Sequence, residues 1–119
     1  MGVNTLDELM AFQLCVRFKR GVYALVRKHP EAYRDYKGRE QLWSAVADAE
    51  SDIAEGWRRW RKREMCQFLR YALASLEEAQ KRLIDGVHRG YYSEAECEPV
   101  LALGRRSGAA TMALLRSLE

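Results

Sequence analysis

The sequence has little of the material that covalent cross-links and tight turns require. Its 119 residues include only three cysteines, two prolines and eight glycines, with no run rich in proline, glycine or serine. An all-β sandwich needs many tight turns built from such residues, so the composition favours helices instead. The length is near the modal size of a domain, and we expect a single domain over residues 1–119.

Long apolar runs are also absent. No stretch approaches the roughly 18 apolar residues that a membrane span needs. Asp7 and Glu8 stand where a signal peptide would carry lysines ahead of an apolar block. We therefore expect a cytoplasmic protein with no membrane partner.

The residues that carry most metal and nucleophile chemistry are few and scattered. Cys15, Cys66 and Cys97 are an odd number with no C-x-x-C spacing, which predicts buried free thiols rather than disulfides or zinc ligands. His29 and His88 fall at expected helix ends, where they meet unpaired carbonyls. No glutamate has a histidine three residues later, and no phosphate-cradling glycine motif is present. We expect no metal, no cofactor and no enzymatic activity.

Apolar residues recur at helical spacing in four segments, which predicts an all-α, up-down-up-down four-helix bundle. A capping box at Thr5 and Glu8 starts the first helix, and Pro30 ends it near position 29. The second helix covers 42–56, and the third covers 65–87 and is closed by Gly90. The fourth runs from a capping box at Ser93 to the end. The first helix is expected to bury Met10, Leu14, Cys15, Phe18, Val22, Leu25 and Val26.

Two further features of these helices could serve contacts between elements or between chains. Phe12, Val16 and Tyr23 form a second apolar strip on the first helix. The strip indicates either a subunit interface or only a wide core-facing stripe. Gly104 and Gly108, one turn apart, either let another backbone approach closely or simply weaken the fourth helix by roughly 1 kcal/mol each.

Positive charge is concentrated between the second and third helices. Seven consecutive residues hold five cations, which leaves the other 112 residues with a net charge of −2 although the whole chain carries +3. Arginine binds phosphate and an indole offers a flat surface for a base, so the segment suits RNA. A solvated loop is the alternative. Trp57 is in register with the core, whereas Trp60 is not. The predicted nucleic-acid-binding residues are Arg58, Arg59, Trp60, Arg61, Lys62 and Arg63.

Three of these cations oppose the helix that follows. Arg61, Lys62 and Arg63 lie beside the positive end of the third helix, at roughly 0.3 to 1 kcal/mol each, and only Glu64 offsets them. Serine or aspartate would serve stability better there. The conflict favours a functional reason for the charge.

The second and third helices are joined around the motif Ile53-Ala54-Glu55-Gly56, which is followed eight residues on by Glu64 and then by Phe68 and Leu69. With these residues, the segment from Gln41 to Tyr91 resembles the four-helix-bundle proteins of the 23S rRNA intervening-sequence family. This resemblance implies a homopentamer with a basic surface for nucleic acid and no known enzymatic activity. A related branch of the same fold is the accessory variability protein of diversity-generating retroelements. That protein resembles a pentamer that partners a reverse transcriptase and its RNA. The shared positions are Gln41, Leu42, Ala45, Ile53, Ala54, Glu55, Gly56, Arg59, Glu64, Phe68, Leu69, Ala72, Ser75, Leu76, Glu78, Leu83, Gly90 and Tyr91.

Two departures from the family pattern make the turn between the second and third helices more basic. Arg58 and Arg61 replace a usual glycine and serine, and Asp52 replaces a usual asparagine. Within the motif, Glu55 and Glu64 are expected to pair with Arg59 or to cap backbone amides, with a catalytic carboxylate pair as the alternative. We expect a homo-oligomer that binds RNA through the basic turn. The rival interpretation is a protein-interaction adaptor, such as an accessory subunit of a reverse transcriptase.

Overall fold

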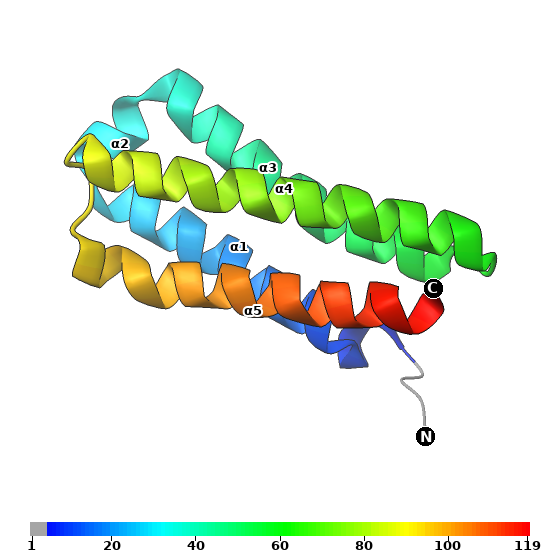
Figure 1. Ribbon diagram of the computed structural model, residues 1–119. Helices are drawn as coiled ribbons and strands as arrows, with labels where there is room; N and C mark the ends of the chain where they lie inside the picture. The colour runs from blue at the N-terminus through cyan, green and yellow to red at the C-terminus, as the bar shows by residue number, and fades with distance from the viewer. Residues whose placement is uncertain (1–4) are drawn as a thin grey trace.

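The computed structural model describes residues 5–119, and this part of the chain is helical without any strand (Figure 1). The all-α prediction is therefore confirmed. The molecule measures 44 × 24 × 20 Å. Its elements are a 3-10 helix η1 (Leu6–Glu8) and the helices α1 (Met10–Lys28), α2 (Pro30–Arg34), α3 (Tyr36–Arg58), α4 (Lys62–His88) and α5 (Glu94–Leu118).

Four long helices lie side by side along the length of the molecule, and α2 joins α1 to α3 at one end (Figure 1). α3 packs on α4 and α1 packs on α5, while α4 contacts α5 and α1 contacts α3. Each helix turns one apolar stripe inward, because residues three and four apart share a face. Over residues 5–119, no helix has the length and apolar character that crossing a bilayer demands. The largest fully buried side chains include Phe18, Ile53, Leu69, Leu76 and Leu83.

The first helix begins one turn later than the sequence predicted. Thr5 precedes the 3-10 helix, and its hydroxyl donates to Glu8 Oε1 at 3.2 Å rather than accepting from a backbone amide. Leu9 is the residue before α1 and makes no side-chain cap. Met10, predicted to be buried, is the first residue of α1 and is exposed, whereas the other six expected core residues of this helix are buried.

The segment between the first and second predicted helices, residues 30–41, is largely helical instead of a plain connection. Pro30 opens α2, since its fixed φ suits a first helical position and its missing N–H would have had no partner there. Asp35 then caps α3 by accepting from Gly38 N at 3.1 Å. The second predicted helix thus starts six residues earlier, and it ends at Arg58 instead of near Gly56. The predicted stop of α1 at His29 is confirmed.

The expected signals around α5 are present. Ser93 Oγ accepts from Glu96 N at 3.1 Å, while Glu96 Oε1 accepts from Ser93 N at 3.4 Å, so the capping box is confirmed. Gly90 follows α4 with φ of +83°, a conformation that L side chains rarely adopt. The two glycines of α5, Gly104 and Gly108, differ in the space around them. A Cβ at Gly104 would lie 2.9 Å from the Phe18 ring, whereas one at Gly108 would meet nothing within 4 Å.

These two glycines provide a matched test of packing. Gly104→Ala is expected to destabilise the fold by about 1 to 3 kcal/mol, because the buried Phe18 ring must move. Gly108→Ala is expected to stabilise it by up to about 1 kcal/mol through helix propensity alone. Urea unfolding followed by circular dichroism measures both free energies. Equal effects of the two substitutions would contradict the close packing at Gly104.

Candidate nucleic-acid interface

The basic turn is defined here as residues Arg58 to Arg63, and it joins α3 to α4 at the end of the molecule that also holds the C-terminus (Figure 1). The turn is short because α3 and α4 converge at Gly56. A Cβ there would lie 3.1 Å from Phe68 Cβ and 3.4 Å from the Met65 carbonyl oxygen. Arg59 and Arg61 are extended, with ψ of 129° and 122°. In this three-residue connection Trp60 and Arg61 are exposed to solvent, whereas Arg59 is half-buried.

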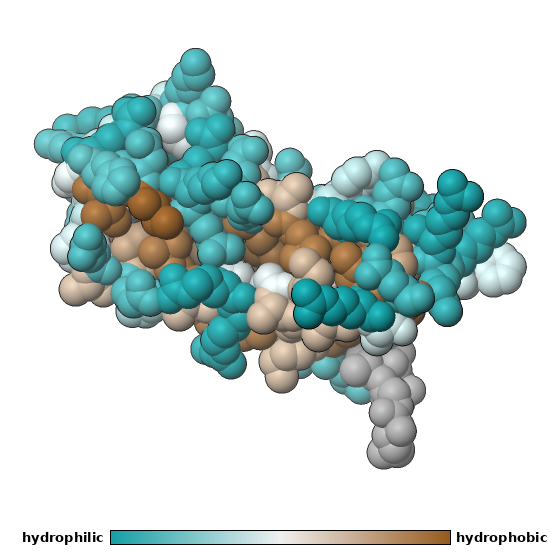
Figure 2. Space-filling model, viewed as in Figure 1, coloured by the Kyte–Doolittle hydropathy of each residue, from teal (hydrophilic) through white to brown (hydrophobic). Residues whose placement is uncertain are grey.

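Few acidic groups neutralise the turn. Glu55 Oε1 lies 3.8 Å from Arg58 Nη1, and Glu64 Oε2 lies 3.9 Å from Arg61 Nε, while both arginines remain largely exposed. Lys62 and Arg63 are exposed and form no ion pair with a described residue. Hydrophilic side chains cover this end of the molecule (Figure 2). Four of the five cations are thus available to a polyanion.

Arg59 differs from its neighbours because the fold holds it in place. Its Nη2 donates to Glu55 Oε2 at 3.0 Å, and its guanidinium lies 5.0 Å from the centre of the Phe68 ring. The pairing of Glu55 with Arg59 is one of the roles expected from the sequence. Glu64 instead faces Arg61. Arg59 therefore ties the end of α3 to α4 and orients the exposed cations around it.

The two tryptophans of this region have different environments. Trp60 is 92% exposed, which makes it the most solvent-accessible large hydrophobic residue among the described residues. Trp57 is half-buried and packs against the main core. Trp60 presents its indole ring to solvent, and Trp57 anchors the end of α3. In the preceding motif, Ile53 and Gly56 are buried and Ala54 is half-buried.

The second apolar strip of α1 is only partly available. Phe12 and Val16 are half-buried and line a shallow groove of about 560 Å³ beside the ion pair of Lys19 with Glu50, whose atoms are 2.6 Å apart. Tyr23 is already engaged within the chain, since its ring centre lies 4.9 Å from that of Trp43. Phe12 also packs against the main core, but part of its side chain and part of that of Val16 remain exposed in the groove.

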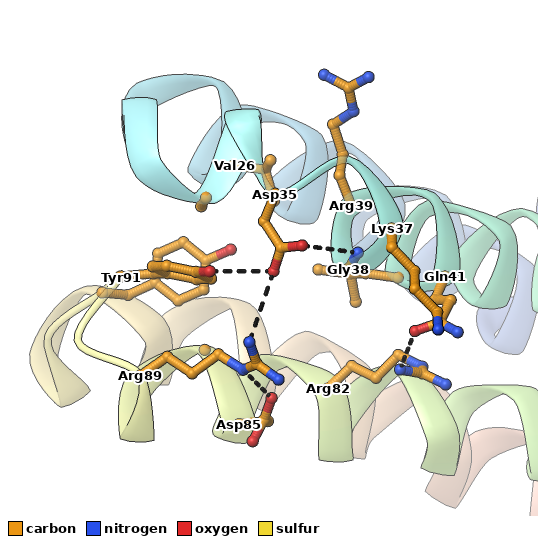
Figure 3. Close-up of a pocket in the computed structure, with 14 residues that line it drawn as sticks. Val26, Asp35, Lys37, Gly38, Arg39, Gln41, Arg82, Asp85, Arg89 and Tyr91 are labelled. Carbon is orange, nitrogen blue, oxygen red and sulfur yellow. Dashed lines mark hydrogen bonds and ion pairs between the residues drawn. The ribbon is translucent and has the colours of Figure 1, made fainter.

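A second cleft, which the sequence did not point to, lies at the opposite end, where the start of α3 meets the end of α4 (Figure 3). It encloses about 340 Å³. Several of its polar groups bond to one another. Asp35 accepts from Gly38 N and from the Tyr91 hydroxyl at 3.0 Å, and these bonds hold the pKa of Asp35 below its usual value. Arg82 donates to Gln41 at 2.8 Å. The cleft is thus a structural network that fixes the end of α4.

The described residues offer no clear set of groups for metal or nucleophile chemistry. Over residues 5–119, no three His, Cys, Asp or Glu side chains lie together so as to hold a metal ion. All three cysteines are free and buried, and burial raises the pKa of the Cys15 thiol to about 12. Burial also raises the pKa of Cys97. The Cys15 and Cys97 thiols therefore stay protonated at neutral pH, and thiolates rather than thiols are nucleophilic.

The fold and the turn together define an all-α protein with an exposed cationic loop at one end. The sequence model of the 23S rRNA-intervening sequence protein family matches residues 7–110, and the chain belongs to this family. Among curated protein sequences, no match to the chain is found. The family membership confirms the resemblance that the motif around Glu55 and Gly56 indicated.

The start of α4 allows a direct test of whether the positive charge of the basic turn lowers the stability of the fold. Arg61 is the residue before α4 and makes no side-chain cap. Arg61→Ser would supply a hydroxyl for the free amides and remove a cation from the positive end of the helix. We expect the free energy of unfolding to rise by about 1 kcal/mol in urea denaturation. Arg63→Ser is the control. It removes a cation as well, but position 63 lies two residues beyond the N-cap, where a serine cannot cap the helix. A loss of stability in Arg61→Ser would contradict the interpretation.

Proposed function

We propose that this protein binds RNA without catalysing a reaction, and that the basic turn is its contact surface. The observation that carries the proposal is that four exposed cations and a tryptophan that is 92% exposed lie together on one short turn. The cations are Arg58, Arg61, Lys62 and Arg63. A surface loop under selection for stability alone would bury the indole or replace the charges, because both are unfavourable for folding.

The chemistry of the turn fits single-stranded or partly unpaired RNA. Arg58 and Arg61 can each contact phosphate oxygens with two parallel N–H groups. Lys62 adds a point charge, and Trp60 offers its ring to an unpaired base. Contacts of this type position the RNA but read little sequence. We therefore expect modest sequence selectivity.

Membership of the 23S rRNA-intervening sequence protein family supports an RNA-related role. The family description links these proteins to a segment of ribosomal RNA, and it names no enzymatic activity. An RNA of that kind would place the protein in the cytoplasm. The rival role as an adaptor for another protein has no specific observation on this surface in its favour.

The family resemblance further implies that the chain forms a homopentamer, with the up-down-up-down four-helix bundle as protomer. In such a ring the basic turn would recur five times, and multivalency would raise affinity for RNA without any new type of contact. We propose that Phe12 and Val16 contribute to the subunit contact, since both are only half-buried and line an open groove on α1.

RNA binding is tested with a fluorescent 20-nucleotide single-stranded RNA across a salt series. A variant with Arg58, Arg61, Lys62 and Arg63 changed to glutamine retains Arg59 and its contacts with Glu55. We expect its affinity to fall at least tenfold at low salt. The slope of log K against log salt should become shallower by about 3, because single strands release about 0.7 counterions per phosphate contact. Trp60→Ala should weaken binding about tenfold.

A matched control separates the turn from net charge. Lys81, Arg105, Arg106 and Arg116 are exposed on α4 and α5, and their replacement by glutamine removes the same four charges. This control should bind RNA with nearly unchanged affinity. Equal losses in the two variants would mean that only overall charge matters. Failure of the native protein to bind any RNA while it is folded would overturn the proposal and direct attention to a protein partner.

The oligomer is tested by light scattering after gel filtration. We expect the native protein to have about five times the 13.8 kDa mass of one chain. Val16→Glu places a charge in the proposed contact and should release monomers, whereas Ala24→Glu on the exposed face of the same helix should not. A native mass equal to that of one chain would refute the ring. An unchanged mass in Val16→Glu would place the contact elsewhere.

A further inference from the structure

Six side chains from α1, α2 and α3 gather at the end of the molecule opposite the basic turn. We call this group the arginine–aromatic cluster. The spacing of apolar residues marked only Tyr23, as part of the second apolar strip, because the other members come from three helices and lie outside the predicted apolar stripes. The cluster consists of Tyr23, Arg27, Tyr33, Tyr36, Arg39 and Trp43.

Arg39 is the centre of the cluster. Its guanidinium carbon lies 4.3 Å from the centre of the Tyr33 ring, 4.7 Å from Tyr36 and 5.3 Å from Trp43. Its Nη1 donates to the Tyr33 carbonyl at 2.9 Å, and its side chain is only 11% exposed. A cation held between three rings fixes their positions, because each ring attracts the charge toward its face. Arg39 thus acts as a positioning residue for the two tyrosines.

The rings that Arg39 holds are open to solvent. Tyr36 is 70% exposed and Tyr33 is 44% exposed. Arg27 is also exposed, and it lies 5.7 Å from the Trp43 ring and 5.8 Å from the Tyr23 ring. From Arg27 to Glu40 the chain has five lysines and arginines against three acids. The surface therefore presents fixed aromatic faces beside an excess of positive charge.

Two polar groups of the cluster lack a hydrogen bond to any described residue, although Arg39 Nε lies 3.9 Å from Glu40 Oε1. Arg39 Nε and Trp43 Nε1 are buried donors with no hydrogen-bond partner within residues 5–119. Unpaired buried donors are uncommon and unfavourable. A cluster that served stability alone would pair them and would not leave Tyr36 in water.

We propose that the arginine–aromatic cluster is a second contact site for single-stranded RNA, in which bases stack on Tyr36 and Tyr33 while Arg27 contacts a phosphate. The proposal rests on the proposed RNA-binding function and extends it to a surface remote from the basic turn. Exposed rings interleaved with arginine are the arrangement that single-stranded nucleic acids favour, since every base has a face that can stack.

The length of α3 sets the length of RNA that can reach both sites. Arg39 and Arg59 are 20 residues apart on one helix, which corresponds to about 30 Å at 1.5 Å per residue. At about 3.4 Å per stacked nucleotide, about nine nucleotides are needed to bridge that distance. A six-nucleotide RNA would occupy one site at a time, whereas a 20-nucleotide RNA could engage both in one protomer.

The test compares a six-nucleotide and a 20-nucleotide single-stranded RNA on native protein and on Tyr36→Ala. The native protein should bind the longer RNA more tightly. We expect Tyr36→Ala to weaken binding of the 20-nucleotide RNA about fivefold to tenfold, with little effect on the part of the binding that depends on the basic turn. Tyr36→Phe should retain native affinity. Tyr71→Ala, which removes an exposed tyrosine from α4, should bind both RNAs as the native protein does.

The outcomes separate this proposal from the proposed function. If the native protein binds RNA through the basic turn but Tyr36→Ala binds both lengths normally, the cluster is not an RNA site, although the main function stands. If no RNA binds at all, both proposals fail. A 20-nucleotide abasic strand keeps the phosphates without the bases. Native protein and Tyr36→Ala should bind it equally, and an equal loss on this strand would overturn base stacking.

Discussion

The close approach of α3 and α4 at Gly56 is the constraint on which the geometry of the basic turn depends. A Cβ at this position would lie 3.1 Å from Phe68 Cβ, so the neighbouring helix would have to shift by a few tenths of an ångström to accept it. Because the helices converge, three residues suffice to connect them, and the cations near the connection cannot fold back onto the core. Arg59 closes the same junction from outside by bonding Glu55 and covering the Phe68 ring. Packing inside the bundle thus determines what the end of the bundle presents to solvent.

Much of the fold could be predicted because helical periodicity and capping act locally. The buried faces of α3 and α4, the stop before Pro30 and the capping box at Ser93 all follow from residues close together in the sequence. The early start of α3 could not be inferred from apolar spacing, because Asp35 acts through a hydrogen bond to Gly38 rather than through burial. Met10 was misplaced because one extra 3-10 turn delays α1.

The candidate sites also differ in whether local sequence or contacts between helices determine them. Residues of a short connection at the tip of two helices are mostly exposed, so the exposure of Trp60 and Arg61 could be inferred from the turn alone, whereas the contacts that half-bury Arg59 could not. The arginine–aromatic cluster depends on how three helices are aligned. Tyr23 meets Trp43 only because α1 and α3 pack with a particular register, and no local pattern encodes that register. Sites made by tertiary contact therefore require the structure.

The burial of all three cysteines affects the resistance of the protein to oxidation and the way in which it can be labelled. Cys15, Cys66 and Cys97 lie within the helix interfaces, where neither oxidants nor alkylating reagents reach them in the folded state. The protein should therefore keep its structure through swings in cellular redox balance. It also needs no removal of natural thiols before spectroscopic labelling, because a single cysteine introduced on the surface would be the one that reacts.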